Sequence, residues 1–94
     1  MLLERAYLQV KAGLEAEFAA MMAGQAVPLL EGTEGTKWVR FGRGVENPGT
    51  FMLLIEWAAM EDHVAFTRHP SFADFRALLA PYTTGGSMEH FEMA

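Results

Sequence analysis

The fold is decided by residues 36–57, TKWVRFGRGVENPGTFMLLIEW, which hold two strand-like runs on either side of a turn. In the first run the side chains alternate, so that Trp38 and Arg40 fall on one side of the strand. The connection contains Asn-Pro-Gly, where proline fixes φ and glycine permits positive φ. The second run, residues 50–57, is nearly all apolar, as expected of a strand that is buried on both faces. The segment therefore predicts a β-hairpin whose second strand is covered on both sides.

Outside this hairpin, the spacing of apolar residues predicts further strands and helices. These are a strand at 2–10, a helix at 14–23, a helix at 60–69, a helix at 71–80 and a strand at 87–93. Residues 25–30 form either a kinked last turn of the first helix or a separate short helix, because Gly24 and Pro28 interrupt the pattern. The resulting order, β-α-β-β-α-α-β, is that of an α+β ferredoxin-like fold with a split βαβ arrangement and a divided second helix. At this length, residues 1–94 are expected to form one domain.

The composition excludes several classes of protein. The chain has a net charge of −5 and no basic stripe, which argues against nucleic-acid binding. It contains no cysteine, so disulfide scaffolds and thiolate metal sites are excluded, and a reducing compartment is favoured. It has neither a signal-peptide pattern nor an apolar run long enough to span a membrane, so a cytoplasmic protein is expected. Hydrophobic residues make up 51% of this short chain, which favours burial of the excess against a partner subunit.

Residues 54–72, LIEWAAMEDHVAFTRHPSF, carry a further pattern. An apolar strand ends in tryptophan, an acidic helix start follows, and His-Pro-Ser-Phe opens the next helix. With Pro81 and the terminal MEHFE at 88–92, this pattern resembles the antibiotic biosynthesis monooxygenase (ABM) domain, a family of dimeric α+β barrels. The resemblance implies a four-stranded antiparallel sheet with helices on one face, and a homodimer in which two sheets pair to form a barrel. Such pairing would explain why the strand at 50–57 is apolar on both sides.

The family that this resemblance indicates contains three kinds of member. Some oxidise polycyclic phenols or anthrones with O₂ and use no metal or prosthetic group, some degrade haem, and many have no assigned activity. The haem-degrading members have a histidine ligand on the helix after the segment that matches Ser71–Phe72, where this chain has Ala73–Arg76. They also have an asparagine on the first strand, where this chain has Glu4–Ala6. Haem degradation is therefore the less favoured activity.

Oxidation of an aromatic substrate by O₂ without a cofactor requires three things of the protein. These are a base that removes a proton, a polar group that holds the resulting anion, and an apolar cage. Only histidine titrates near neutral pH without help from its surroundings, which makes His63 the candidate base. The candidate anion holders are Arg40 and Arg5, and the candidate substrate-pocket residues are Tyr7, Trp38, Trp57 and Phe66. Packing in the core or at the dimer interface is the alternative role of the aromatic residues, and it is favoured for Trp57.

No metal site and no cofactor are predicted. His63 and His69 are six residues apart on one short helix, so they do not share a face of that helix. His90 comes from a distant strand, and only folding of the chain could bring it close to either of them. Glu61 and Asp62 are adjacent carboxylates at a helix start, where the helix dipole explains them.

Two functional hypotheses of different classes remain open, together with a structural one. The favoured hypothesis is a homodimeric, cofactor-independent monooxygenase-like protein that acts on a small aromatic or quinol-type substrate. Its rival is a non-catalytic dimeric protein that binds a small molecule or is associated with stress, and the third hypothesis is a dimerisation module. An enzyme is expected to have a closed pocket between sheet and helices that holds at least one histidine and one arginine.

Overall fold

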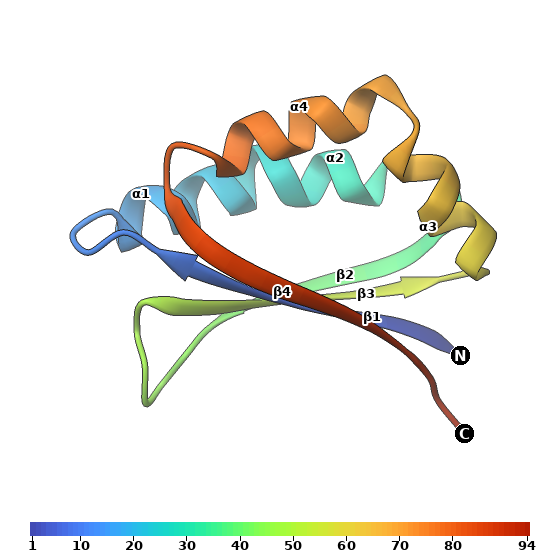
Figure 1. Ribbon diagram of the computed structural model, residues 1–94, viewed down its shortest axis with the longest axis horizontal. Helices are drawn as coiled ribbons and strands as arrows, with labels where there is room; N and C mark the ends of the chain where they lie inside the picture. Colours follow the sequence, from blue (N-terminus) through green and yellow to red (C-terminus); the bar gives the residue numbers. More distant parts are fainter.

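Four strands form one antiparallel sheet in the computed structural model, which describes residues 1–94 (Figure 1). The strands are β1 (Leu2–Val10), β2 (Thr36–Arg43), β3 (Thr50–Trp57) and β4 (Thr83–Glu92), in the spatial order β2-β3-β1-β4. β1 pairs with both β3 and β4, and β3 also pairs with β2. The first and third strands therefore occupy the centre of the sheet, as the ferredoxin-like arrangement requires, and the predicted α+β fold class is confirmed.

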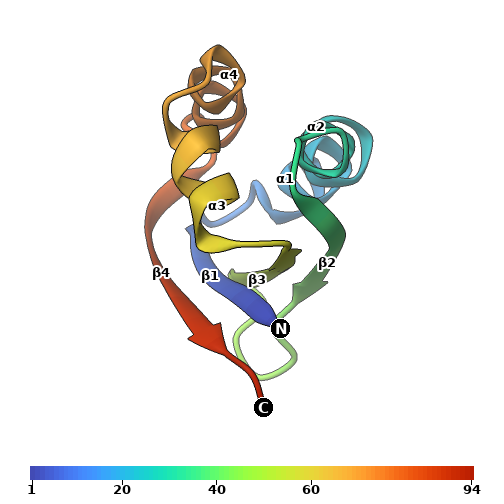
Figure 2. The same ribbon diagram turned by 90° about the vertical axis from the view of Figure 1, so that its right-hand side faces the viewer.

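Helices cover one face of this sheet (Figures 1 and 2). They are α1 (Glu15–Met21), the π-helical segment η1 (Met22–Ala26), α2 (Val27–Glu31), α3 (Met60–Thr67) and α4 (Pro70–Leu79). α1, η1 and α2 follow one another without a break. The interruption of the apolar spacing at Gly24 therefore marks a wider, π-helical turn, and the helix does not end there. Pro28 is the second residue of α2, which directly follows this wider turn, and proline cannot donate a backbone hydrogen bond inside a helix. None of these helices combines the length and the apolar content needed to cross a membrane.

The last strand begins earlier than the sequence predicts. β4 starts at Thr83 and not at residue 87, although a Gly-Gly pair ordinarily marks the end of a structural element. Here Gly85 and Gly86 both lie within the strand. A Cβ atom at Gly86 would lie 2.6 Å from the carbonyl oxygen of Tyr7, so only glycine allows β4 to approach β1 this closely. The same glycine leaves the helix-facing side of β4 without a side chain at this point.

The core lies between the helices and the sheet. On β3, Phe51, Leu53, Ile55 and Trp57 are buried, and they alternate with half-buried residues that face away from the helices. Phe18 of α1 has no exposed surface and packs edge-on against Phe51, with ring centroids 5.0 Å apart. The helices and β3 thus exclude water from the centre of the molecule and fix the position of the sheet beneath them.

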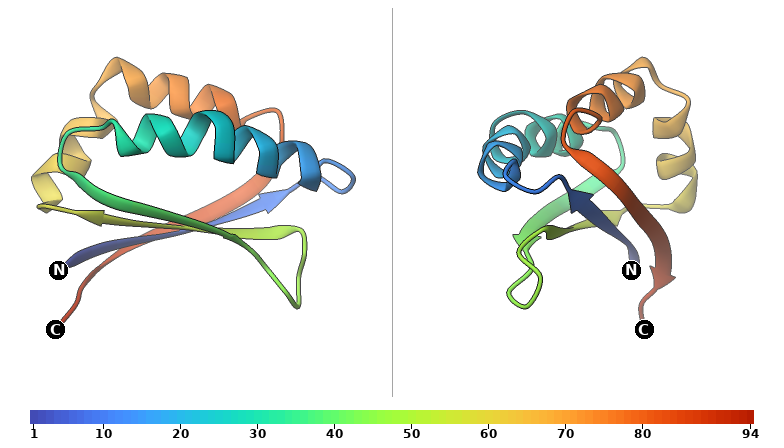
Figure 3. Two further views of the ribbon diagram at one scale, coloured as in Figure 1. Left: turned by 180° about the vertical axis from the view of Figure 1, so that it is seen from behind. Right: turned by 60° about the vertical axis from the view of Figure 1, so that its left-hand side comes forward.

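The opposite face of the sheet is covered by no other part of the chain (Figures 2 and 3). We call it the open face. Strand alternation and cross-strand pairing show which side chains point to the open face. They are those of Leu3, Arg5, Tyr7, Gln9, Trp38, Arg40, Met52, Leu54, Glu56, Ser87, Glu89 and Phe91. Half of these side chains are apolar or aromatic, and Tyr7 and Phe91 are 40% and 42% exposed. A sheet face in contact with water is ordinarily more polar than this.

Candidate functional site

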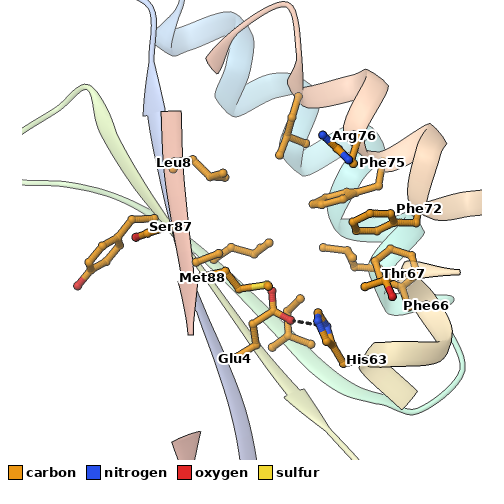
Figure 4. A pocket seen from close by; sticks show the side chains of 17 residues that line it. Glu4, Leu8, His63, Phe66, Thr67, Phe72, Phe75, Arg76, Ser87 and Met88 are labelled. Carbon is orange, nitrogen blue, oxygen red and sulfur yellow. Dashed lines mark ion pairs between the residues drawn. The ribbon is translucent and has the colours of Figure 1, made fainter. Parts of the chain in front are cut away.

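A pocket of about 450 Å³ lies between the sheet and the helices α3 and α4 (Figure 4). It exists because the sheet offers little side-chain volume opposite α4: Gly86 has no side chain, and Ala6 on the neighbouring strand ends at Cβ. Phe72 and Phe75 of α4 point into the space that remains, and α4 has no fully buried residue (Figure 4).

The lining of this pocket is chiefly apolar, since 11 of its 17 residues are hydrophobic. The lining residues are Glu4, Ala6, Tyr7, Leu8, Leu30, Leu53, Ile55, His63, Phe66, Thr67, Phe72, Phe75, Arg76, Leu79, Gly86, Ser87 and Met88. The pocket is not fully enclosed, because rim residues such as Met88 are half exposed, at 50%. Its size and composition suit a small, largely apolar ligand that enters from solvent.

His63 reaches this pocket from α3. The helix begins at Met60, after Ala59 in an extended conformation, and His63 and Phe66 are the two residues that it buries. They are three residues apart and therefore lie on the same face of the helix. His63 is 7% exposed, and its ring lies edge-on to Trp57 with centroids 5.6 Å apart. The helix thereby places a titratable side chain in the wall of an otherwise apolar pocket.

A polar cluster forms around Glu4, which is 6% exposed. Glu4 of β1 and His90 of β4 are directly opposite each other in the strand pairing. Glu4 Oε1 lies 3.1 Å from His63 Nδ1 and 3.3 Å from His90 Nε2, and it accepts a hydrogen bond from Trp57 Nε1 at 2.9 Å. The two imidazole rings are in contact, with centroids 4.2 Å apart. We call Glu4, His63 and His90 the Glu-His-His cluster.

The surroundings of His63 favour its neutral form. Burial lowers the pKa of His63, and the adjacent His90 lowers it further, whereas the Glu4 carboxylate opposes both effects. Although both rings lie close to Glu4, neither His63 Nδ1 nor His90 Nε2 makes an aligned hydrogen bond. A neutral imidazole keeps an electron pair on one of its nitrogens, so His63 is equipped to accept a proton or to bind a metal ion.

The structure brings together only some of the residues predicted for the site. His63 and Phe66 line the pocket. Trp57 does not line it but lies behind His63, where it holds Glu4 and packs on Phe66. Tyr7 borders the pocket, yet strand alternation turns its ring to the open face, where the Arg5 guanidinium lies 4.0 Å from the ring centroid.

The other predicted residues lie on the far side of the sheet from His63. Arg5 forms an ion pair with Glu89, and the Arg40 guanidinium lies 5.1 Å from the centroid of Trp38. All of these side chains belong to the open face, so the sheet separates them from the pocket. The arginine that lines the pocket is Arg76 of α4.

Sequence reasoning missed Glu4 and His90 as members of the site. A signal for Glu4 was present, because it is the one charged residue among the helix-facing positions 2, 4, 6, 8 and 10 of β1. A carboxylate on a buried face requires polar partners, which is a reason to search for them. His90 is a candidate by residue type alone, because its approach to Glu4 depends on the pairing of β1 with β4, which no local pattern reveals.

Fold and site together define a class: a ferredoxin-like α+β protein with an apolar pocket between helices and sheet and a buried histidine in the pocket wall. Comparison with known proteins makes this more specific. The family model for antibiotic biosynthesis monooxygenase matches residues 1–78, and the chain belongs to this family. The resemblance inferred from the sequence is thereby confirmed.

Several similar proteins support this assignment. YczJ, an uncharacterized protein of Bacillus subtilis (strain 168), is 34% identical in an alignment 94 residues long that covers 98% of this chain and 98% of YczJ. The crystal structure of a Bordetella bronchiseptica protein, described as belonging to the same family, superposes with a TM-score of 0.91 at 28% identity and covers 99% of this chain and 96% of that one. SnoaB of Streptomyces nogalater, a cofactor-independent oxygenase, superposes with a TM-score of 0.85 at 15% identity, over 99% of this chain and 92% of that one. At 15% identity, the likeness to SnoaB shows the fold alone.

Proposed function

We propose that the chain is a cofactor-independent monooxygenase that acts on a small aromatic or quinol-type substrate bound in the pocket. The observation that carries this proposal is a largely apolar pocket with His63 in its wall and Glu4 beside Nδ1 of that histidine. The phenylalanine rings in the lining suit a flat aromatic molecule. SnoaB, which shares the fold, supports the class of chemistry and says nothing of the substrate.

The proposed reaction begins with removal of a proton by His63. A carboxylate beside Nδ1 favours the tautomer that carries its hydrogen on Nδ1, and this leaves the electron pair on Nε2. Nε2 takes the proton from an acidic O–H or C–H group of the substrate, and the electrons of that bond stay on the substrate as an anion. The Glu4 carboxylate then stabilises the imidazolium that has formed.

The substrate anion next reacts with O₂. In an anthrone-type substrate, the methylene group becomes a carbonyl: one oxygen atom is retained, and the other leaves as water with the two methylene hydrogens. The substrate supplies all the electrons, so the step needs no further reductant. Arg76 is the guanidinium that borders the pocket, and we assign to it the role of anion holder that the sequence predicts for Arg5 or Arg40.

We also propose that two copies of the chain associate through the open face. The apolar and aromatic side chains on this face have no covering element within the chain, and burial against a second copy would remove them from water (Figure 3). Each copy would keep its own pocket, because the pocket lies on the other side of the sheet.

In this proposal residues 1–94 act as one domain in the cytoplasm, where a chain without cysteine suits the reducing conditions.

Oxygen uptake tests the proposed activity. Metal-stripped protein, mixed with a panel of anthrones and hydroquinones, is expected to consume O₂ well above the spontaneous rate. Ala6→Leu adds volume to the pocket wall and is expected to lower the uptake at least about tenfold, because it displaces part of the substrate. Ala20→Leu adds the same volume at an exposed position of α1 and should leave the uptake unchanged. Binding of these compounds without any O₂ uptake would favour the non-catalytic binding protein instead.

A further inference from the structure

Two histidine nitrogens in the Glu-His-His cluster lack the partners that their burial requires. His63 Nδ1 and His90 Nε2 have almost no accessible surface, and neither makes an aligned hydrogen bond. His63 as a whole is 7% exposed, and the His90 side chain is 15% exposed. Buried polar atoms are ordinarily satisfied, because an unpartnered one loses its hydration without compensation. Glu4 Oε1 lies 3.1 Å from the first nitrogen and 3.3 Å from the second, but neither contact is aligned as a hydrogen bond.

The same two nitrogens surround a space that also contains the Glu4 carboxylate. The three donor atoms, one from each side chain, all lie within 4.8 Å of one another. A metal ion holds nitrogen and oxygen donors at about 2.0–2.2 Å, so neighbouring donors in a tetrahedral shell are about 3.3–3.6 Å apart. Glu4 Oε1 lies 3.1 Å from His63 Nδ1 and 3.3 Å from His90 Nε2, which is close to that spacing.

The chemical types of the three donor groups indicate which metal ions the cluster would bind. Two imidazoles and one carboxylate suit divalent first-row transition metals, whereas Mg²⁺ and Ca²⁺ prefer oxygen donors alone. Strand pairing holds Glu4 opposite His90, and α3 supplies His63. The Trp57 indole donates a hydrogen bond to Glu4, the type of outer contact that orients carboxylate ligands.

We propose that the Glu-His-His cluster is a binding site for a divalent first-row transition-metal ion, held by Glu4, His63 Nδ1 and His90 Nε2. The ion satisfies both unpartnered nitrogens and balances the buried carboxylate. His69 has no part in this site, because it lies at the N-cap of α4 and not on α3. The second histidine is His90, which β4 supplies. Since Glu4 and His63 also line the pocket, the ion lies in the pocket wall.

This site does not depend on the proposed oxygenase activity, but it would affect that activity. A metal ion on Nδ1 of His63 leaves the ring hydrogen on Nε2, so the nitrogen proposed as the base has no electron pair to accept a proton. Metal binding and proton removal are thus alternative uses of the same imidazole. The metal-loaded protein is expected to lack catalysed O₂ uptake.

Titration with Co²⁺ tests the metal site. Metal-free protein titrated with Co²⁺ in a calorimeter should bind one ion per chain, and visible absorption should report nitrogen ligands on cobalt. His90→Gln is expected to weaken the affinity at least about tenfold, since loss of an outer contact alone costs that much at metal sites. His69→Asn alters an exposed histidine outside the cluster and should leave the affinity unchanged.

A second variant guards against loss of fold. Glu4→Gln keeps the volume of the side chain and an oxygen that can accept from Trp57, and it should also weaken Co²⁺ binding. Near-ultraviolet circular dichroism establishes that each variant is folded. Absence of stoichiometric binding to the wild type, or equal affinity in the wild type and both folded variants, would overturn the metal site. Neither result bears on the oxygenase proposal, which is tested on metal-stripped protein by O₂ uptake.

Discussion

His63→Gln is expected to lower catalysed O₂ uptake by about 10²–10⁴-fold, the usual contribution of a positioned general base. Glutamine is uncharged, and its amide N–H can still point toward Glu4, so the contact between Glu4 and Trp57 has no reason to rearrange. It has no nitrogen that can accept a proton. Steady-state O₂ consumption should therefore show a lower kcat at similar KM, because substrate binding depends on the apolar lining.

His69→Asn is the matched control for this loss. His69 is exposed at the N-cap of α4, where its Nδ1 accepts a hydrogen bond from the Ser71 backbone N–H at 3.1 Å. Asparagine also caps helices well, so the start of α4 is kept. This variant is expected to consume O₂ at the wild-type rate. Wild-type uptake by His63→Gln would show that His63 is not the base.

Leu54→Lys is expected to convert the proposed dimer into monomers. Leu54 lies on the open face directly between Arg5 of β1 and Arg40 of β2, so lysine there places three cations side by side across the sheet. Two such faces cannot meet without juxtaposing like charges, which costs several kcal/mol. Sedimentation equilibrium at micromolar concentration should give twice the 10.4 kDa chain mass for the wild type and the chain mass for the variant.

Val45→Lys is the control for the added charge. Val45 is 88% exposed in the loop between β2 and β3, and its replacement should leave the dimer intact. A wild-type protein that sediments at 10.4 kDa would contradict the proposed association. A Leu54→Lys variant that remains dimeric would place the interface on another surface.

The fold could be predicted because its signals are local. The apolar run Thr50–Trp57, the Asn-Pro-Gly turn before it and the alternation in Leu2–Val10 each define an element without reference to the rest of the chain. The start of β4 could not be predicted in this way. Gly86 is required by the close approach of the Tyr7 carbonyl, and a contact between residues so far apart in the sequence leaves no local pattern.

The site could be predicted only in part, for a related reason. His63 and Phe66 lie on one helix, and their spacing places them together. Glu4 and His90 meet only through the register of β1 with β4, which composition and periodicity do not encode. Arg5 and Arg40 were candidates by residue type, but alternation along their strands puts both on the open face, away from His63.

His63 is proposed to remove a substrate proton before O₂ reacts, and anaerobic mixing tests this step by itself. Metal-stripped protein is combined with an anthrone in the absence of O₂, and the absorption spectrum of the substrate is followed. We expect the spectrum of the substrate anion to appear with the wild type and to be absent with His63→Gln. If the wild type consumes O₂ in air but forms no anion without O₂, or if His63→Gln forms the anion as well as the wild type does, proton removal by His63 is not how this protein works.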